Sequence, residues 1–370
     1  MDAANIKGSM TRIFAIDAVR GWVMIFMALD HAMYFCYIHI FAEGFQSMRP
    51  DPLPDVFHYL TRFITHYCAP TFIFLAGFSI ILYSMSRRDS LTENQITQKL
   101  ITRGILLIIL QFTIENFCWG YTPGVMMVYF GVLACIGADM IILAYGRRLP
   151  VTVLTIVSVL LLTGTPLLLK SFPLTNADSF LEILLQPNSE GWLRVLYPVL
   201  PWLGVMGLGC SCGLWVKNRP EKLTRFFLLL GTLMLVLWFL LRLGNSYGNL
   251  TMYQGGGLRD FMLMSKYPPS IVFLLWNLGG MSIAIGALSY VGPQVPFKKF
   301  WNVVTLFGQT PLFFYVIHLC LYKTLSLIPW GGTLMGGYIA WLVGLVIMYP
   351  LCRSYLSLKK KYPESVLQYI

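Results

Sequence analysis

Charged residues are scarce in this sequence. Asp, Glu, Lys and Arg together make up 12% of the 370 residues, whereas hydrophobic residues make up 57%. An ordinary soluble domain carries about 25% charged residues, so the composition excludes that class of protein. The net charge of +11 does not indicate nucleic-acid binding, because no basic, aromatic-interleaved soluble segment is present. The distribution of the basic residues along the chain explains this charge better.

Paired cysteines and metal-ligand spacings are also missing. The eight cysteines are scattered through apolar segments, with no Cys-x-x-Cys pair and no paired-histidine spacing. A disulfide framework or a zinc site would need such pairs, so we expect neither and no metal cofactor. The cysteines are better interpreted as small buried hydrophobic residues.

Long apolar runs fill most of the chain. A transmembrane helix needs about 20 mainly apolar residues, and runs near or above that length recur throughout. We place them at 13–41, 57–85, 99–118, 122–146, 150–170, 192–216, 225–243, 270–292, 302–325 and 331–352. The sequence therefore predicts an all-α, multi-pass membrane protein with about ten transmembrane helices. Residues 1–370 would form one continuous transmembrane domain.

Lysine and arginine are unequally divided between the two ends of these expected helices. The side that holds both termini is rich in them, with Arg87, Arg88, Arg147, Arg148 and 359–361 among its basic residues. The opposite side has far fewer. Basic residues are enriched in cytoplasmic loops, so we expect both termini in the cytoplasm. An even number of crossings satisfies this topology, and the net positive charge is mainly a topology signal.

Ionisable residues inside the expected helices are the strongest functional signal. The first run carries Asp17 and Arg20, three residues apart on one helix face, and then Asp30 next to His31. Charged side chains in a membrane helix are costly, so they usually pair, face the bundle interior or line a wet cavity. For Asp17 and Arg20 we favour a structural ion pair near the cytoplasmic entrance. Attraction of a substrate phosphate by Arg20 is the lesser alternative.

Three of the five histidines lie inside expected helices and away from the helix ends at the outer interface, namely His31, His66 and His318. Counted from the helix ends, all three fall in the outer half of the membrane, so a shared polar cavity is the simplest hypothesis. The alternative for each is a buried histidine that only satisfies neighbouring polar groups. The other two, His39 and His58, lie at the outer interface, where we expect them to be solvated.

Several other polar residues are candidates for the same cavity. Tyr315 lies one turn before the last histidine and is a candidate hydrogen-bond partner for it. Glu115 and Asn116, near the end of the third run, either line the cavity or extend outward to water. Lys266 and Tyr267 lie at the outer end of the eighth run, at the mouth of the expected cavity.

These residues fall into an ordered set of motifs along the chain. The set comprises Asp17-x-x-Arg20-Gly21 with Asp30-His31, the run Ala69-Pro70 to Gly77, the run Lys266-Tyr267-Pro268-Pro269-Ser270, and Gly308-x-x-Pro311 with Tyr315-x-x-His318. In this order the motifs resemble the bacterial branch of the heparan-α-glucosaminide N-acetyltransferase-like membrane proteins. That branch belongs to the transmembrane acyltransferase superfamily, and the resemblance spans nearly the whole chain.

The resemblance implies acetyl-CoA as the donor on the cytoplasmic side and an acceptor reached from the other side. In the lysosomal enzyme the acceptor is the free amine of a terminal glucosamine, and a histidine near the far end of the motif-bearing helix is catalytic. Counted from Arg20 and Gly21, His31 falls where that enzyme has an asparagine. The implied partners are acetyl-CoA, a glycan or amino-sugar acceptor and the lipid bilayer, and no nucleic acid. The implied location is the bacterial cytoplasmic (inner) membrane, and whether a homodimer forms stays open.

The predicted function is a transmembrane acetyltransferase that uses acyl-CoA and modifies a sugar amine or hydroxyl. A buried histidine would act as the general base or would carry the acyl group itself. The catalytic candidates are His31, Asp30, His66 and His318; the candidates for contact with CoA are Arg20 and Asp17; and the candidates for contact with the acceptor are Tyr315, Lys266, Tyr267, Glu115 and Asn116.

Two other classes of function stay open at this point. In a proton-coupled transporter or flippase the same histidines would relay protons during substrate movement. The chain has no internal repeat, which weakens a transporter of the inverted-repeat type. In a binding or scaffold protein without turnover, the packing motifs would remain and the acetyl transfer would not occur.

Overall fold

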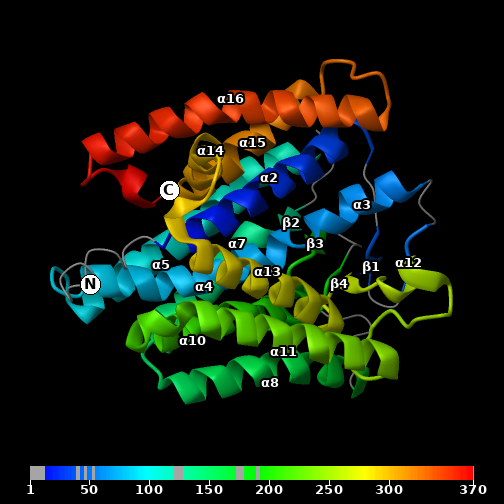
Figure 1. The fold of residues 1–370 in the computed structure, drawn as a ribbon, viewed down its shortest axis with the longest axis horizontal. Coiled ribbons are helices and arrows are strands. Elements are labelled where there is room, and N and C mark those ends of the chain that lie inside the picture. The colour runs from blue at the N-terminus through cyan, green and yellow to red at the C-terminus, as the bar shows by residue number, and fades with distance from the viewer. Residues whose placement is uncertain are drawn as a thin grey trace.

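Long helices make up most of the structure, and the axes of most of them are roughly aligned, either parallel or antiparallel (Figure 1). The structure is a computed structural model, and it describes residues 13–38, 42–45, 48–51, 55–120, 128–171, 179–188 and 192–369. In chain order the elements are α2 (Phe14–Cys36), β1 (Gly44–Phe45), α3 (Val56–Thr65), α4 (Cys68–Arg87), α5 (Glu93–Leu110), the π-helix η1 (Gln111–Glu115), α6 (Asn116–Gly120), β2 (Val128–Phe130), α7 (Val132–Gly146), α8 (Val151–Ser171), α9 (Ser179–Leu185), β3 (Leu193–Val195), α10 (Val199–Asn218), η2 (Pro220–Lys222), α11 (Leu223–Gly244), α12 (Gly257–Phe261), β4 (Ser265–Tyr267), α13 (Ile271–Val291), η3 (Gly292–Gln294), α14 (Lys298–Gln309), α15 (Pro311–Leu325), α16 (Leu334–Lys361) and η4 (Val366–Tyr369).

Short polar side chains fix where several helices begin. Thr92 and Gln95 form a capping box at the start of α5, in which each side chain satisfies a backbone N–H of the other residue. Ser270 accepts a hydrogen bond from the backbone N–H of Phe273 at 3.3 Å and starts α13 in the same manner. These caps satisfy N–H groups that the helices themselves leave without a partner.

Helix α2 lies at the centre of the bundle (Figure 1). It packs against α3, α4, α13, α14, α15 and α16. The approach to α14 is so close that a Cβ atom built at Gly21 would lie 1.8 Å from the carbonyl oxygen of Val304. A Cβ atom at Gly308 would lie 1.9 Å from the carbonyl oxygen of Asp17. The glycines of two of the motifs therefore permit the contact that fixes α14 against α2.

The ninth expected helix, 302–325, is not continuous. It is divided into α14 and α15, whose axes are bent by 92°. The break falls at Thr310 and Pro311, because proline has no N–H to continue the helix and restricts the residue before it. The second expected helix is likewise divided, into α3 and α4, at His66 and Tyr67. Both breaks place a histidine of the sequence-based hypothesis within a turn or two of irregular backbone.

A helix lies within each of the ten segments that the sequence predicts, but the number of membrane spans is not confirmed as ten. In the described part of the chain, seven helical segments are long and apolar enough to cross a membrane, or eight if α14 and α15 count as one span. Helix α7 has only 15 residues, and α2 carries three charged side chains, Asp17, Arg20 and Asp30. The protein is therefore a mainly helical, multi-pass membrane protein.

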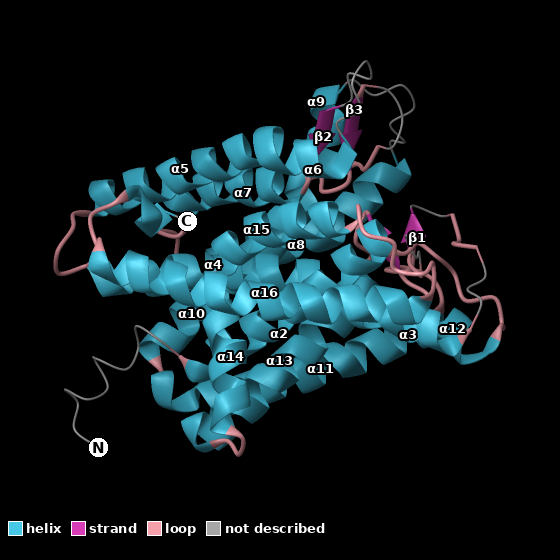
Figure 2. Ribbon diagram, turned by 90° about the horizontal axis from the view of Figure 1, so that it is seen from above, coloured by secondary structure: helices cyan, strands magenta, loops and turns pink. Residues whose placement is uncertain are grey.

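Two short parallel sheets qualify the expectation of an all-α fold. Strand β1 pairs with β4, and β2 pairs with β3. All four strands gather at the end of the helices opposite the start of α2 (Figures 1 and 2). Each strand has only two or three residues, too short for an apolar alternation to reveal it in the sequence. The sheets matter because they carry Tyr129, Arg194, Lys266 and Tyr267 to the end of α2.

Candidate functional site

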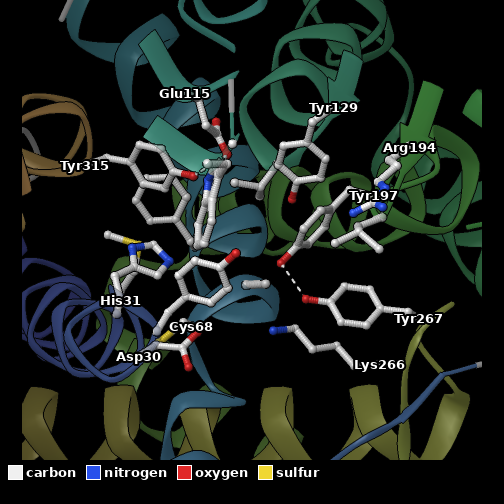
Figure 3. A pocket seen from close by; sticks show the side chains of 18 of the residues that line it. Asp30, His31, Cys68, Glu115, Tyr129, Arg194, Tyr197, Lys266, Tyr267 and Tyr315 are labelled. Carbon is white, nitrogen blue, oxygen red and sulfur yellow. Dashed lines mark hydrogen bonds between the residues drawn. The ribbon is translucent and has the colours of Figure 1, made fainter. Parts of the chain in front are cut away.

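A cavity of about 490 Å³ lies beside the C-terminal half of α2. It is enclosed by α2, α4, α6 and α15 on one side and by β2, β3 and β4 on the other (Figure 3). Its wall includes seven of the residues selected from the sequence, namely Asp30, His31, Glu115, Asn116, Lys266, Tyr267 and Tyr315. Aromatic side chains supply much of the remaining wall, among them Tyr34, Phe72, Trp119, Tyr129 and Tyr197.

His31 and His318 form a hydrogen-bonded pair at this wall. Nδ1 of His31 lies 2.7 Å from Nε2 of His318, the ring centroids are 4.9 Å apart, and the ring planes are inclined to each other by 15°. Nδ1 of His318 donates a hydrogen bond to the carbonyl oxygen of Phe314 at 2.8 Å, because a carbonyl can only accept. When both rings are neutral, Nε2 of His318 must then accept from Nδ1–H of His31. The basic lone pair of His31 is therefore on Nε2.

His31 and His318 differ in their access to the cavity. His31 lines it and turns toward the tyrosines (Figure 3), whereas His318 lies behind His31 and is fully buried. The ring of Trp119 packs edge-on against His31 with a centroid distance of 5.0 Å. This arrangement fixes the orientation of one imidazole at the cavity surface and supports it with a second.

Glu115 is held on the same wall by two aromatic donors. The hydroxyl of Tyr315 donates to Oε1 of Glu115 at 2.9 Å, and Nε1–H of Trp119 donates to the same oxygen at 3.2 Å. Tyr315 therefore bonds to Glu115 rather than to His318, which it contacts only by its ring. Glu115 ends a π-helical turn, Gln111–Glu115, and such turns inside α-helices frequently mark functional sites.

An ionic cluster centred on Arg62 adjoins the cavity, and two of its members, Arg62 and Asp30, line the cavity wall. Its guanidinium donates to both carboxylate oxygens of Glu43 and to Oδ1 of Asp30. Nε2 of His66 lies 3.2 Å from Oε2 of Glu43. Burial disfavours the charge of Glu43, but Arg62 and His66 together outweigh it and hold the pKa of Glu43 well below its usual range. Asp30 thus forms an ion pair with Arg62.

Of the three histidines expected to share one cavity, only His31 lines it. His318 contacts the cavity only through its hydrogen bond to His31, and His66 has no part in the wall. His66 is absent from the cavity wall and packs between the rings of Phe63 and Phe273. The expectation that His58 is solvated is wrong, because its side chain is buried, with Nε2 3.0 Å from the hydroxyl of Tyr37 and Nδ1 3.0 Å from Oδ1 of Asp55. His39 lies outside the described residues.

Asp17 and Arg20 lie away from this cavity, toward the start of α2. Nη1 of Arg20 is 3.6 Å from Oδ1 of Asp17, as the spacing of three residues predicts. Arg20 also donates to Oγ of Ser79 at 2.6 Å and to the carbonyl oxygen of Gly308 at 3.3 Å. These bonds join α2, α4 and α14, which favours the structural ion pair. A contact between Arg20 and a CoA phosphate stays a prediction.

The sequence-based selection missed Glu43 and Arg62 as members of a site. Glu43 lies in a connection after the first run, where an acidic residue gives no signal, and its partner Arg62 is 19 residues away. Trp119 could have been found, because it lies four residues after Glu115 and shares its helix face. In the described part of the chain, no group of three or more His, Cys, Asp or Glu side chains is arranged to hold a metal ion.

Helices of membrane-spanning length around a cavity lined by aromatic and ionisable side chains define the class, a multi-pass membrane protein with an internal cavity. The family model of the heparan-alpha-glucosaminide N-acetyltransferase catalytic domain matches residues 12–253. The matched region covers more than half of the chain, and the chain belongs to this family of transmembrane acetyltransferases, as the motifs predict. A comparison with curated protein sequences gave no significant match.

Proposed function

We propose that the protein transfers an acetyl group from acetyl-CoA, supplied on the cytoplasmic side, to a sugar amine or hydroxyl that enters from the opposite side. The observation that carries this proposal is the hydrogen-bonded pair of His31 and His318 at the cavity wall. Family membership supplies the reaction class, and the pair supplies a base where the reaction needs one.

His31 acts as the general base in this proposal. Its Nε2 takes the proton from the acceptor N–H or O–H while the acceptor atom attacks the carbonyl carbon of the thioester. The C–S bond then breaks, and the CoA sulfur leaves with the proton that His31 returns. His318 positions the ring of His31 and stabilises the imidazolium, because its Nε2 continues to accept from Nδ1–H.

The rest of the wall suits a sugar ring and a developing negative charge. Aromatic faces such as Trp119 and Tyr129 provide flat apolar surface, and few polar groups interrupt it. Tyr315 has committed its hydroxyl hydrogen to Glu115, so we assign stabilisation of the acetyl oxygen to the amide N–H of Asn116. Asp30 contributes by its charge near His31 while it holds Arg62 in place.

A sided transfer assay tests this function. The purified protein is reconstituted into vesicles with labelled acetyl-CoA on one side and glucosamine on the other, and acetylated glucosamine is measured. We expect label in the acceptor with the wild type and none with His31→Ala. The matched control is His66→Ala, which removes a buried histidine that does not line the cavity. Uptake of unmodified glucosamine would support the transporter class instead, and undiminished transfer by His31→Ala would remove the assigned base.

A further inference from the structure

Lys266 brings a buried cation to the side of the cavity that lies away from His31. Its side chain is only 4% exposed, and Figure 3 shows the ammonium extending from β4 into the cavity. Among the described residues the ammonium has no hydrogen-bond or ion-pair partner, and its nearest charge-stabilising contact is the ring of Tyr267, whose centroid is 5.1 Å away. A buried ammonium without a partner is costly, so its retention needs a reason.

The neighbouring ionic cluster explains why Lys266 stays charged. Glu43 and Asp30 bring two negative charges against the single positive charge of Arg62, which leaves one negative charge near the cavity. Burial lowers the pKa of Lys266, but Tyr267 and the two carboxylates outweigh it and hold the value above its ordinary range. The cluster thus balances the charge of Lys266 from a distance, and the three N–H donors of the ammonium remain open to the cavity.

A second cation and two hydroxyls lie on the same side. Arg194 projects from β3 at the cavity wall, and among the described residues no carboxylate pairs with it. The hydroxyl oxygens of Tyr197 and Tyr267 lie 3.4 Å apart between the two cations (Figure 3). The wall also carries the carboxylates of Asp30 and Glu115, from α2 and η1, and the guanidinium of Arg62, which pairs with Asp30. Lys266 and Arg194 are therefore the cations of the wall that form no ion pair with a described carboxylate.

We propose that the side formed by Lys266, Arg194, Tyr197 and Tyr267 binds an anionic group of the acceptor, a carboxylate, sulfate or phosphate. Charge-assisted hydrogen bonds from the ammonium and guanidinium to such a group satisfy donors for which the described residues supply no carboxylate. The acceptor is then an acidic sugar, with its reacting amine or hydroxyl toward His31 and its anionic group toward Lys266. This assignment of the acceptor rests on the proposed acetyl transfer.

The first test compares two acceptors that differ by one anionic group, glucosamine and glucosamine 6-phosphate. We expect the wild type to use glucosamine 6-phosphate with a kcat/KM about tenfold or more above that for glucosamine. Lys266→Met removes the charge and keeps the length of the side chain, and we expect the ratio to fall close to one. The matched control is Lys298→Met, at an exposed lysine of α14, which should keep the wild-type ratio. An equal ratio in the wild type and Lys266→Met overturns the proposal.

The same anionic chemistry occurs in the phosphates of CoA, and the kinetics separate the two sources. If Lys266→Met raises the KM for acetyl-CoA and leaves the acceptor ratio unchanged, the cation serves the donor and the acceptor assignment is wrong. Calorimetric titration of glucosamine 6-phosphate without acetyl-CoA tests the site independently of turnover. We expect the affinity to fall by about tenfold in Lys266→Met. Binding that depends on Lys266 without any acetyl transfer would contradict only the enzyme function, whereas transfer with binding insensitive to Lys266 would contradict only the anion site.

Discussion

The two buried histidine regions of this protein are built on opposite principles. His31 and His318 form a chain of neutral donors and acceptors that ends on the carbonyl of Phe314, and one ring reaches the cavity. His66 belongs to an ionic cluster in which Arg62 and Glu43 satisfy each other, and it does not reach the cavity. The same residue type therefore occurs in two different kinds of surroundings.

In the proposed function, this difference separates the base, His31, from a histidine with a structural role, His66. In the neutral chain, each hydrogen bond fixes the proton on a stated nitrogen, so the lone pair that remains is directed by the fold. In the ionic cluster the charges hold one another, and the cluster ties the connection that precedes β1 to α2 and α3. The proposed base needs the hydrogen-bonded surroundings of His31. The ionic cluster instead holds the connection before β1 in place.

We expect the largest effect, a loss of turnover, when the pair of His31 and His318 is disrupted. His31→Ala removes the base, and we expect kcat to fall by about 1,000-fold, within the range for general base catalysis. His66→Ala should lower kcat by less than about tenfold, because His66 supports only the cluster. The two rates are measured with labelled acetyl-CoA on folded protein, checked by size-exclusion chromatography. Equal losses in both variants would remove the distinction between the regions.

Breaking the second region should act on stability. Arg62→Met leaves the buried carboxylates of Glu43 and Asp30 without their partner, which costs about 3–5 kcal/mol of unfolding free energy. The measurement is thermal or denaturant unfolding in detergent. The double variant Arg62→Met with Glu43→Gln removes one of the stranded charges and should recover part of the loss. No recovery would mean that the charges are not what Arg62 stabilises.

A smaller effect on rate should follow from changing His318, which positions His31 without lining the cavity. His318→Leu removes the acceptor for Nδ1–H of His31, and we expect kcat to fall by about 10- to 100-fold. The KM for acetyl-CoA should not change. His318→Gln keeps an acceptor oxygen near that position and should restore much of the rate. A glutamine variant as slow as the leucine variant would show that packing, and not the hydrogen bond, matters there.

The smallest effect is a dependence of stability on acid pH in the ionic cluster. Burial raises the pKa of Glu43, but the charges and hydrogen bonds of Arg62 and His66 together outweigh it, so the pKa in the folded protein lies well below its ordinary value of 4.5. Its charged form therefore stabilises the fold fully above the unfolded-state pKa, and this contribution is lost as pH falls through the folded-state pKa. Glu43→Gln should be less stable than the wild type at neutral pH, and the difference should shrink in acid. A difference that stays constant into acid would contradict the ion pair.

Local spacing predicted those parts of the structure that depend on neighbours in sequence. The Asp17–Arg20 pair needs only one helical turn, and the observed distance of 3.6 Å agrees with the spacing. The positions of the helices likewise follow from runs of apolar residues, because each run can form its own hydrogen bonds. The break at Pro311 had a signal, the proline itself, whose effect on the preceding residue predicts a helix boundary.

Pairs that join distant helices could not be predicted from the sequence. His31 and His318 are 287 residues apart, and their contact depends on how α15 turns after the 92° bend. The partner of Asp30 was equally hidden, because Arg62 lies on another helix and Glu43 on a connection. His31 was selected because it follows Asp30 in an expected membrane helix. In the structure, Asp30 forms an ion pair with Arg62. The second imidazole supplies the support that the sequence assigned to Asp30.

The central claim is that Nε2 of His31 meets the reacting acetyl group inside the cavity. A cryo-EM structure of the protein with a non-transferable acetyl-CoA analogue tests it most directly. The account predicts density for the acetyl end beside His31, within reach of Nε2, with His66 outside contact distance. Density that places the acetyl end beside His66, or outside the cavity, would contradict it.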